Sequence, residues 1–219
     1  MFLVQKLAPD FSAKAVENGK IITLTRSDLL KSPSDPSKPG YALLLFCPLD
    51  FTFVCPTELT AYADRVGEFH GEGCKVVGLS VDSEYSHLQW TKQPRNLGGL
   101  FSESHGKILL MRNLCFKILG FNLPLLSDLS KEISRSFGVL SANGNVALRA
   151  QVLIDRTGTI RHHSVNDLGI GRSVDESLRL VQATKWVDEN GEVCPVNWKK
   201  GQAAINPSEA SEYFSKHQK

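Results

Sequence analysis

The chain has 219 residues, 42% of them hydrophobic and 22% charged, which is typical of one globular domain and excludes long disordered or fibrous stretches. Its 25 Lys and Arg residues oppose 23 Asp and Glu residues, and the net charge of +2 gives no indication of a nucleic-acid partner. No uncharged apolar run is long enough to cross a membrane.

The N-terminal segment does not have the pattern of a secretory signal, because Lys6 and Asp10 interrupt its apolar stretch. Cysteines are too few for a scaffold built on disulfides. They stand at positions 47, 55, 74, 115 and 194. We therefore expect a reducing, cytoplasmic setting, in which a transient disulfide is allowed and a lasting structural one is disfavoured.

The first half of the chain predicts two buried strands with a helix between them. A loop rich in Pro and Ser, residues 32–40, precedes the continuous apolar run Tyr41–Phe46, which predicts a buried strand. Apolar residues at helical spacing begin at Thr57 and stop at Gly71. The run Cys74–Val81 predicts the second buried strand.

The second half predicts short helices and a late hairpin. Short helices are expected at residues 84–92 and 129–137, and a hairpin is expected from strands at 151–155 and 159–164. Ser173 and Glu176 have the spacing of a capping box, which predicts a helix ending near residue 187.

These elements predict a layered α/β domain over residues 1–187, with a central, partly parallel sheet flanked by helices. The order of the elements fits the thioredoxin-like fold. Residues 188–219 are polar and rich in Gly and Pro, and we interpret them as a C-terminal arm.

Cys55 is placed where a buried strand gives way to a helix, so it falls in the first turn of that helix. Unpaired amides and the helix dipole favour an anion there and can lower the pKa of a thiol. Thr52 is three residues earlier, so its hydroxyl can lie beside the sulfur, and Pro48 can exclude water. The alternative is that Cys55 is a small buried hydrophobic residue, as many free cysteines are.

The stretch Pro48–Glu58 resembles the peroxiredoxins, whose signature is Pro, three residues, Thr, two residues and Cys, matched here by Pro48, Thr52 and Cys55. The sequence of this stretch looks like that of the typical two-cysteine subclass of the family. Further matches follow in the same order along the chain, at Ser80–Ser83, His87–Trp90, Pro124–Asp128, Val165–Leu168, Gly171–Glu176 and Gly191–Pro195.

The resemblance implies a thiol-dependent peroxidase that uses no cofactor. Cys55 matches the peroxidatic cysteine, which attacks a peroxide and becomes a sulfenic acid, and Cys194 matches the resolving cysteine, which then forms a disulfide. By the same resemblance the chain forms a head-to-tail homodimer with intersubunit disulfides, commonly assembled into decamers, and thioredoxin is the usual reductant.

Arg149 matches the active-site arginine of the family, Arg172 a second arginine that positions it, and Glu58 the acid that holds both. A fixed guanidinium beside Cys55 favours the thiolate and stabilises charge that moves onto peroxide oxygens. Without the resemblance, each arginine is more often a solvated surface group.

The remaining cysteines and histidines carry less information. Cys47 replaces a tyrosine that the family usually has before Pro48, and it is either a buried bystander or a second thiol that is oxidised in turn. Cys74 fits the core. His162 and His163 are adjacent on a strand, so they face opposite sides and cannot bind one metal ion.

One segment departs from the family. The usual Gly-Gly-Leu-Gly is interrupted after Gly98 and Gly99 by Leu100–Ile118, which could be an extra helix, an interaction segment or a splicing error. In the family this glycine loop and a C-terminal Tyr-Phe, here Tyr213 and Phe214, cover the active-site helix and control overoxidation of the cysteine. The interruption therefore puts that sensitivity in question.

Two other functions are compatible with the same residues. A holdase chaperone or a peroxide-signalling relay would use the same fold without fast turnover, and an inert relative would have a pocket closed by the insert. Catalytic turnover of peroxide that requires Cys55 would distinguish a peroxidase from these two alternatives.

Overall fold

The computed structural model describes residues 3–102, 108–111, 114–117 and 120–217. Side chains are described for all of these except residues 108–111 and 114–117. The chain divides into two compact units, Met1–Arg172 and Ser173–Lys219.

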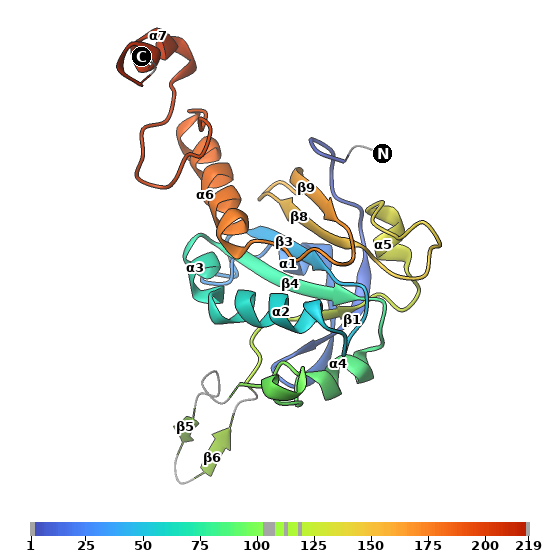
Figure 1. Ribbon diagram of the computed structural model, residues 1–219. Helices are drawn as coiled ribbons and strands as arrows, with labels where there is room; N and C mark the ends of the chain where they lie inside the picture. The colour runs from blue at the N-terminus through green and yellow to red at the C-terminus, as the bar shows by residue number, and fades with distance from the viewer. Residues whose placement is uncertain (1–2, 103–107, 112–113, 118–119, 218–219) are drawn as a thin grey trace. The chain divides into compact units, whose positions relative to one another are not determined.

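The first unit is built on a seven-stranded mixed sheet in the order β2-β1-β7-β4-β3-β8-β9 (Figure 1). Strand β3 pairs in parallel with β4, and β4 with β7, whereas the other pairs are antiparallel. The strands are β1 Ser12–Glu17, β2 Lys20–Thr25, β3 Tyr41–Phe46, β4 Cys74–Ser80, β7 Leu125–Ser127, β8 Arg149–Ile154 and β9 Ile160–Asn166.

Helices connect the strands, and α2 and α3 follow one another along one face of the sheet beside β4 (Figure 1). Helix α4 contacts β1 and β7. The helices of the first unit are α1 Arg26–Leu29, α2 Val54–Asp64, α3 Val66–Gly71, α4 Glu84–Trp90, the 3₁₀ turn η1 Arg95–Leu97, and α5 Glu132–Ser136.

The core explains why β3 is an unbroken apolar run. Every residue of β3 is buried, because the strand lies inside the sheet and both of its faces are covered. Leu44 and Phe46 join one core cluster with side chains of β4 and of the α5 region, among them Val77 and Phe137. Burial of each such side chain stabilises the fold by roughly 1.5–3 kcal/mol.

The two buried strands and the late hairpin are confirmed, with β3 at the predicted residues. The prediction for the first long helix was wrong in two respects: α2 begins at Val54 rather than Thr57, and the chain breaks at Arg65 into α2 and α3. Pro56 fits the first turn of α2, because the amides there have no acceptor within the helix.

The helix expected at residues 129–137 is shorter, because Lys131 adopts a left-handed backbone with φ 62° and α5 begins only at Glu132. The carboxylate of Asp128 accepts hydrogen bonds from the amides of Ile133 at 3.0 Å and Ser134 at 2.7 Å, and so caps the start of α5.

The interrupting segment lies partly outside the described residues, since 103–107, 112–113 and 118–119 are not among them. In place of an extra helix, β5 Ile108–Met111 and β6 Leu114–Lys117 form an antiparallel hairpin. The Ser102 amide donates to the Gly120 carbonyl oxygen at 3.1 Å, so the two ends of the segment meet.

The second unit begins with α6 Val174–Asn190, continues through the 3₁₀ turn η3 Pro207–Glu209 and ends in α7 Ala210–His217. Ser173 caps α6, and the helix runs three residues beyond the predicted end near Val187. The compact units divide at Arg172, before this helix, whereas the sequence suggested a division at residue 187.

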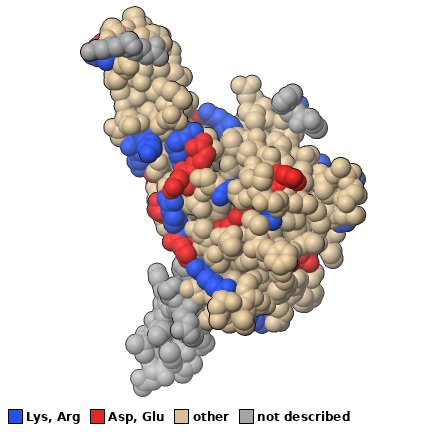
Figure 2. Space-filling view, viewed as in Figure 1, with Lys and Arg blue, Asp and Glu red and all other residues tan. Residues whose placement is uncertain are grey.

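Charged side chains of both signs are interspersed over the visible face of the described residues (Figure 2). No helix among the described residues has the length and apolar character needed to cross a bilayer.

Candidate active site

The loop between β3 and α2 is anchored by a buried polar cluster around Asp50. The Asp50 carboxylate accepts from Ser80 Oγ at 2.8 Å and lies 2.6 Å from His87 Nδ1, while His87 Nε2 lies 3.0 Å from the Leu126 carbonyl oxygen. The Asp50 amide donates to the Asp82 carboxylate at 2.7 Å. This cluster ties the loop to β4, α4 and β7, and so fixes the start of α2.

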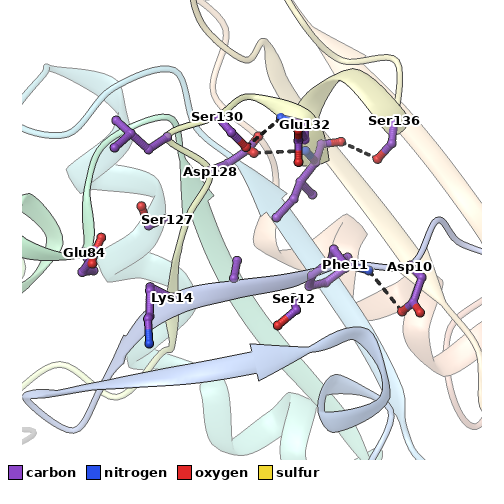
Figure 3. A pocket seen from close by; sticks show the side chains of 13 residues that line it. Asp10, Phe11, Ser12, Lys14, Glu84, Ser127, Asp128, Ser130, Glu132 and Ser136 are labelled. Atoms are coloured by element: carbon purple, nitrogen blue, oxygen red, sulfur yellow. Dashed lines mark hydrogen bonds between the residues drawn. The ribbon is translucent and has the colours of Figure 1, made fainter.

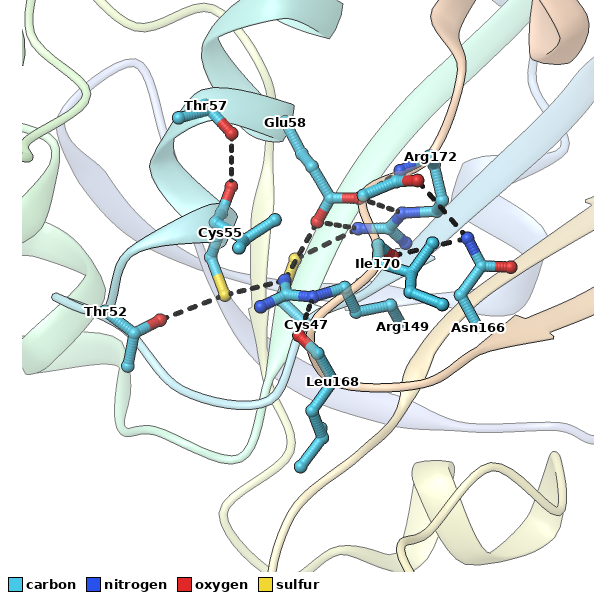
Figure 4. A network of polar contacts seen from close by, with 12 residues as sticks. Cys47, Thr52, Cys55, Thr57, Glu58, Arg149, Asn166, Leu168, Ile170 and Arg172 are labelled. Atoms are coloured by element: carbon cyan, nitrogen blue, oxygen red, sulfur yellow. Dashed lines mark hydrogen bonds and ion pairs between the residues drawn. The ribbon is translucent and has the colours of Figure 1, made fainter.

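Cys55 lies buried in the first turn of α2, with a hydroxyl and a guanidinium beside its sulfur (Figure 4). Thr52 Oγ1 and Arg149 Nη1 each lie 3.2 Å from Cys55 Sγ. Thr52 Oγ1 is also 3.0 Å from the Leu49 carbonyl oxygen, so its one proton can serve either acceptor. Pro48 is buried in the same loop.

Glu58 joins the two predicted arginines into one network (Figure 4). Its carboxylate accepts from Arg149 Nη1 at 3.0 Å, from Arg172 Nε at 2.8 Å and from Arg172 Nη2 at 2.9 Å. Arg149 Nε donates to the Leu168 carbonyl oxygen at 2.6 Å. All three charged side chains are at most 4% exposed, so the fork geometry of each arginine is held rigidly.

The environment of Cys55 favours its thiolate. A hydrogen bond from the Cys47 thiol, and further ones from Thr52 and Arg149, outweigh the opposing effect of burial and lower the pKa of Cys55 from 9.0 to about 6. Burial by itself would lower the pKa of Arg149, but its contacts with the Cys55 sulfur and Glu58 raise it overall. The guanidinium therefore stays charged beside the sulfur.

Cys47 is buried at the end of β3 and belongs to the same network. Arg172 Nη2 lies 3.4 Å from Cys47 Sγ. The hydrogen bond to Cys55, together with burial, raises the pKa of the Cys47 thiol well above 9.0. Of the two cysteines, Cys47 is thus the protonated thiol and Cys55 the thiolate.

A cavity of about 300 Å³ opens beside the first turn of α2, between Thr52 and the glycines at 98 and 99. Gly98 has φ 77°, a left-handed conformation that suits glycine, and its carbonyl oxygen accepts from Trp90 Nε1 at 2.9 Å. A Cβ atom at Gly99 would lie 1.9 Å from the Gln93 carbonyl oxygen, so only glycine fits. The predicted glycine loop therefore borders this cavity, which Thr52 also lines.

The other predicted residues lie in the second unit. Cys194 is partly buried, its Sγ lies 3.8 Å from the Ala183 carbonyl oxygen, and burial raises the pKa of its thiol. Tyr213 and Phe214 lie on α7, where Tyr213 stacks on His217 with 4.3 Å between ring centroids.

No group of His, Cys, Asp and Glu residues suited to a metal ion occurs among the described residues. His162 and His163 pair with successive residues of β8, Leu153 and Val152, so their side chains point to opposite faces. Cys74 is buried in β4, as expected for a core residue.

A larger cavity of about 440 Å³ lies elsewhere, lined by residues of β1 and the α5 region (Figure 3). Two of its acidic groups already serve the fold, since Asp128 caps α5 and Asp10 accepts from the Phe11 amide at 3.1 Å. No cysteine lines this cavity, in contrast to the network around Cys55.

The anchoring role of Asp50 and its partners Ser80, Asp82 and His87 was not predicted from the sequence. Ser80–Ser83 and His87–Trp90 were identified only as matching segments. The hydrogen bonds join residues 30 or more positions apart, which no local spacing reveals.

Comparisons with known proteins agree with this geometry. The sequence model of the AhpC/TSA family matches residues 4–163, and one described as the C-terminal domain of 1-Cys peroxiredoxin matches residues 183–216. Peroxiredoxin-2 of Mus musculus is 44% identical over 216 residues, 98% of this chain and 96% of that protein.

The mitochondrial thioredoxin-dependent peroxide reductase of Homo sapiens is 46% identical over 215 residues, 97% of this chain and 74% of that protein. The crystal structure of reduced 2-Cys peroxiredoxin from Plasmodium vivax superposes with a TM-score of 0.83 at 38% identity, and the match covers 98% of this chain and 100% of that one.

The C-terminal family model carries a one-cysteine name, yet the segment it matches contains Cys194, and the solved relative is a two-cysteine protein. Full-length similarity, the mixed sheet and the sulfur site agree with one another. The chain therefore belongs to the AhpC/TSA family, among the peroxiredoxins with a thioredoxin-like fold, and is similar to their two-cysteine members.

Proposed function

We propose that this peroxiredoxin reduces hydrogen peroxide and small organic hydroperoxides, with Cys55 as the attacking thiolate. The observation that carries the proposal is the position of Cys55 Sγ, which lies 3.2 Å from both Thr52 Oγ1 and Arg149 Nη1. A nucleophile, a hydroxyl and a fixed cation meet at one buried point.

In the proposed reaction the Cys55 sulfur attacks one peroxide oxygen, the O–O bond breaks, and the other oxygen leaves as water or an alcohol after taking up a proton. Arg149 stabilises the negative charge that develops on the leaving oxygen, and the Thr52 hydroxyl orients the peroxide. Glu58 and Arg172 act as positioning residues, since they hold the Arg149 guanidinium against the sulfur.

The second half of the cycle is proposed from the family. The Cys55 sulfenic acid condenses with Cys194 of a second subunit, and a dithiol protein such as thioredoxin reduces the resulting disulfide. The name of the human relative states that it depends on thioredoxin. A head-to-tail homodimer, and decamers built from it, are our proposal for the assembly.

The relatives named above are peroxiredoxins and a peroxide reductase, which favours the peroxidase over the holdase or signalling relay. We propose a reducing compartment, the cytoplasm, as the location. Because the human relative is mitochondrial by name, cell fractionation is the direct test.

The function is tested by peroxide consumption with thioredoxin, thioredoxin reductase and NADPH. Cys55→Ser is expected to abolish consumption while keeping the circular dichroism of the wild type. Cys194→Ser is the matched control, because it should still consume one equivalent of peroxide and then stop, and it should not form a dimer on a non-reducing gel. Full turnover by Cys55→Ser would refute the proposal.

A further inference from the structure

Two cysteine side chains, not one, are built into the active-site network (Figure 4). Cys47 follows the last residue of β3, and its amide donates to the Leu79 carbonyl oxygen at 2.8 Å, which holds its backbone in register with β4. Its side chain is 1% exposed. Cys47 is therefore fixed in place and shielded from thiols in solution.

Each sulfur has its own guanidinium, and one carboxylate links the two. Arg149 Nη1 lies 3.2 Å from Cys55 Sγ, Arg172 Nη2 lies 3.4 Å from Cys47 Sγ, and Glu58 bonds both arginines. The Cys47 thiol also lowers the pKa of Cys55, so the two sulfurs influence each other within this network. A newly oxidised Cys55 therefore shares one buried ion-pair network with a second thiol.

We propose that Cys47 is a second redox-active thiol of this site, which condenses with the sulfenic acid of Cys55 to form a disulfide within one subunit. This inference rests on the proposed function, because the sulfenic acid has to form on Cys55 first.

The step balances without any further oxidant. The Cys47 sulfur attacks the Cys55 sulfur, an S–S bond forms and the S–O bond breaks. The hydroxyl of the sulfenic acid leaves as water with the proton that Cys47 releases. The Cys47 sulfur is oxidised, the Cys55 sulfur is reduced by the same amount, and the peroxide of the preceding step supplied the oxidising equivalents.

Oxidation of Cys55 also prepares Cys47 to react. Before oxidation, the negative Cys55 sulfur holds the Cys47 proton through their hydrogen bond, which raises the pKa of the Cys47 thiol. Conversion of Cys55 to a neutral sulfenic acid removes that charge, while the positive charge of Arg172 stays beside Cys47 and favours its thiolate. Oxidation of Cys55 therefore removes the largest effect that keeps Cys47 protonated, while burial of Cys47 continues to raise the pKa of its thiol.

The structure also allows the small movement that bond formation requires. A disulfide needs the two sulfur atoms about 2.05 Å apart, closer than a hydrogen bond holds them. Cys55 is the second residue of α2, and Phe53 at the N-cap makes no side-chain hydrogen bond to the helix. A small shift of Cys55 toward Cys47 therefore breaks no side-chain cap at the start of α2.

The test uses the full chain with Cys194→Ser, which leaves Cys47 and Cys55 in place. The reduced protein is treated with hydrogen peroxide, free thiols are alkylated, and the protein is cleaved before Asp50, which separates Cys47 from Cys55. We expect a peptide linked through both cysteines that dithiothreitol separates, from a protein that runs as a monomer on a non-reducing gel.

The matched control is Cys47→Ser/Cys194→Ser, with Cys47→Ala/Cys194→Ser beside it in case the serine disturbs folding. Without the second thiol, Cys55 should proceed to sulfinic acid under peroxide that leaves Cys194→Ser in the disulfide form. Cys74, buried in β4, should stay reduced in all of them.

Two results would overturn this inference while leaving the proposed function in place. Alkylated Cys47 beside a sulfenic or sulfinic Cys55 in Cys194→Ser would show that the two thiols do not condense. A linked peptide found only in a gel dimer would show that the bond joins two subunits. If Cys55 stays reduced in every variant, the proposed function fails, and the inference fails with it.

Discussion

Charge balance around Cys55 explains why a buried sulfur is ionised. The two guanidinium groups of Arg149 and Arg172 face one carboxylate, that of Glu58, and all three side chains are at most 4% exposed. Buried charge is costly unless it is compensated. A thiolate at Cys55 supplies the missing negative charge, so the site is electrically balanced in its reactive form.

The pH dependence of the peroxide reaction should report this ionisation. With a pKa of about 6, Cys55 is mostly thiolate at neutral pH, and the thiolate is the nucleophile. We predict a second-order rate constant that is flat above pH 7 and falls about tenfold for each pH unit below 6. Stopped-flow measurements of the reduced enzyme from pH 4.5 to 9 check this. A rate that still rises between pH 7 and 9 would contradict it.

The Thr52 hydroxyl should contribute to both ionisation and rate. Thr52→Val keeps the shape but removes a hydrogen bond to a charged group, so we predict a raised pKa of Cys55 and a rate lowered about 10- to 100-fold at pH 7. Thr60→Val is the matched control, because its hydroxyl donates to the Pro56 carbonyl oxygen at 2.7 Å. Equal rates for both variants would remove Thr52 from the mechanism.

For single residues, the sequence predicted contacts between residues that are close to each other along the chain. Thr52 and Cys55 are close because three residues of a turn separate them. Arg149 is 94 positions from Cys55, and its place came from resemblance to a family, not from spacing. The contact between Arg172 and Cys47 was not predicted, since it depends on how the end of β3 meets the segment before α6.

At the scale of elements, the fold holds the α2 turn through the loop before it. His87 is buried, and both of its ring nitrogens face acceptors, the Asp50 carboxylate and the Leu126 carbonyl oxygen. Burial by itself would lower the pKa of His87, but the hydrogen bond to Asp50 and its charge raise it above 6.5 overall. His87 is thus a buried cation paired with Asp50.

Removal of His87 should destabilise the protein in a pH-dependent way. His87→Leu leaves the Asp50 carboxylate buried without its cation, and we predict a loss of about 3–5 kcal/mol in the free energy of unfolding. Because the folded-state pKa is raised, this contribution is complete below pH 6.5 and is lost as the pH rises through the folded-state pKa.

The measurement is urea unfolding of wild type and His87→Leu between pH 5.5 and 9, with His70→Gln on α3 as the control. The difference in the free energy of unfolding between wild type and His87→Leu should become smaller toward high pH. If this difference instead becomes larger as the pH rises, His87 is neutral in the folded protein.

The elements that were predicted correctly are those whose pattern is set by burial. β3 and β4 lie inside the sheet, so their residues are almost all apolar. β1 and β2 were missed because several of their residues are exposed, and β7 because it has only three residues. α7 was missed within a polar segment, although Asn206 followed by Pro207 is a helix-start signal.

For the whole molecule, the segment that interrupts the glycine loop behaves as an addition at one point. Ser102 and Gly120 are joined by a backbone hydrogen bond of 3.1 Å, so the chain leaves and returns at the same place. Because these two ends are adjacent, a shorter loop in place of the segment can join them at little cost in conformational entropy. We therefore expect the fold of the first unit not to depend on what lies between them.

Replacement of residues 103–119 by two glycines should leave the active site intact. We predict a peroxide rate constant within about twofold of wild type and an unchanged or higher melting temperature, since a shorter loop loses less entropy on folding. Rapid kinetics and calorimetry check both. A large loss of rate with the fold retained would show that the segment takes part in the reaction.

Assembly was the part least accessible to sequence reasoning. Cys194 was identified from its motif, but which subunit it reaches depends on contacts between chains, which one sequence does not encode locally. The division into units at Arg172 likewise follows from tertiary contacts rather than composition.

The central claim is that the Cys55 thiolate is the atom that peroxide oxidises. The most direct measurement mixes reduced Cys47→Ser/Cys194→Ser protein with one equivalent of hydrogen peroxide in the presence of a dimedone reagent, which traps the sulfenic acid, and maps the adduct by mass spectrometry. We predict an adduct on Cys55, and none when Cys55 is also replaced by serine. An adduct on another cysteine, or unreacted peroxide beside a reduced Cys55, would contradict the account.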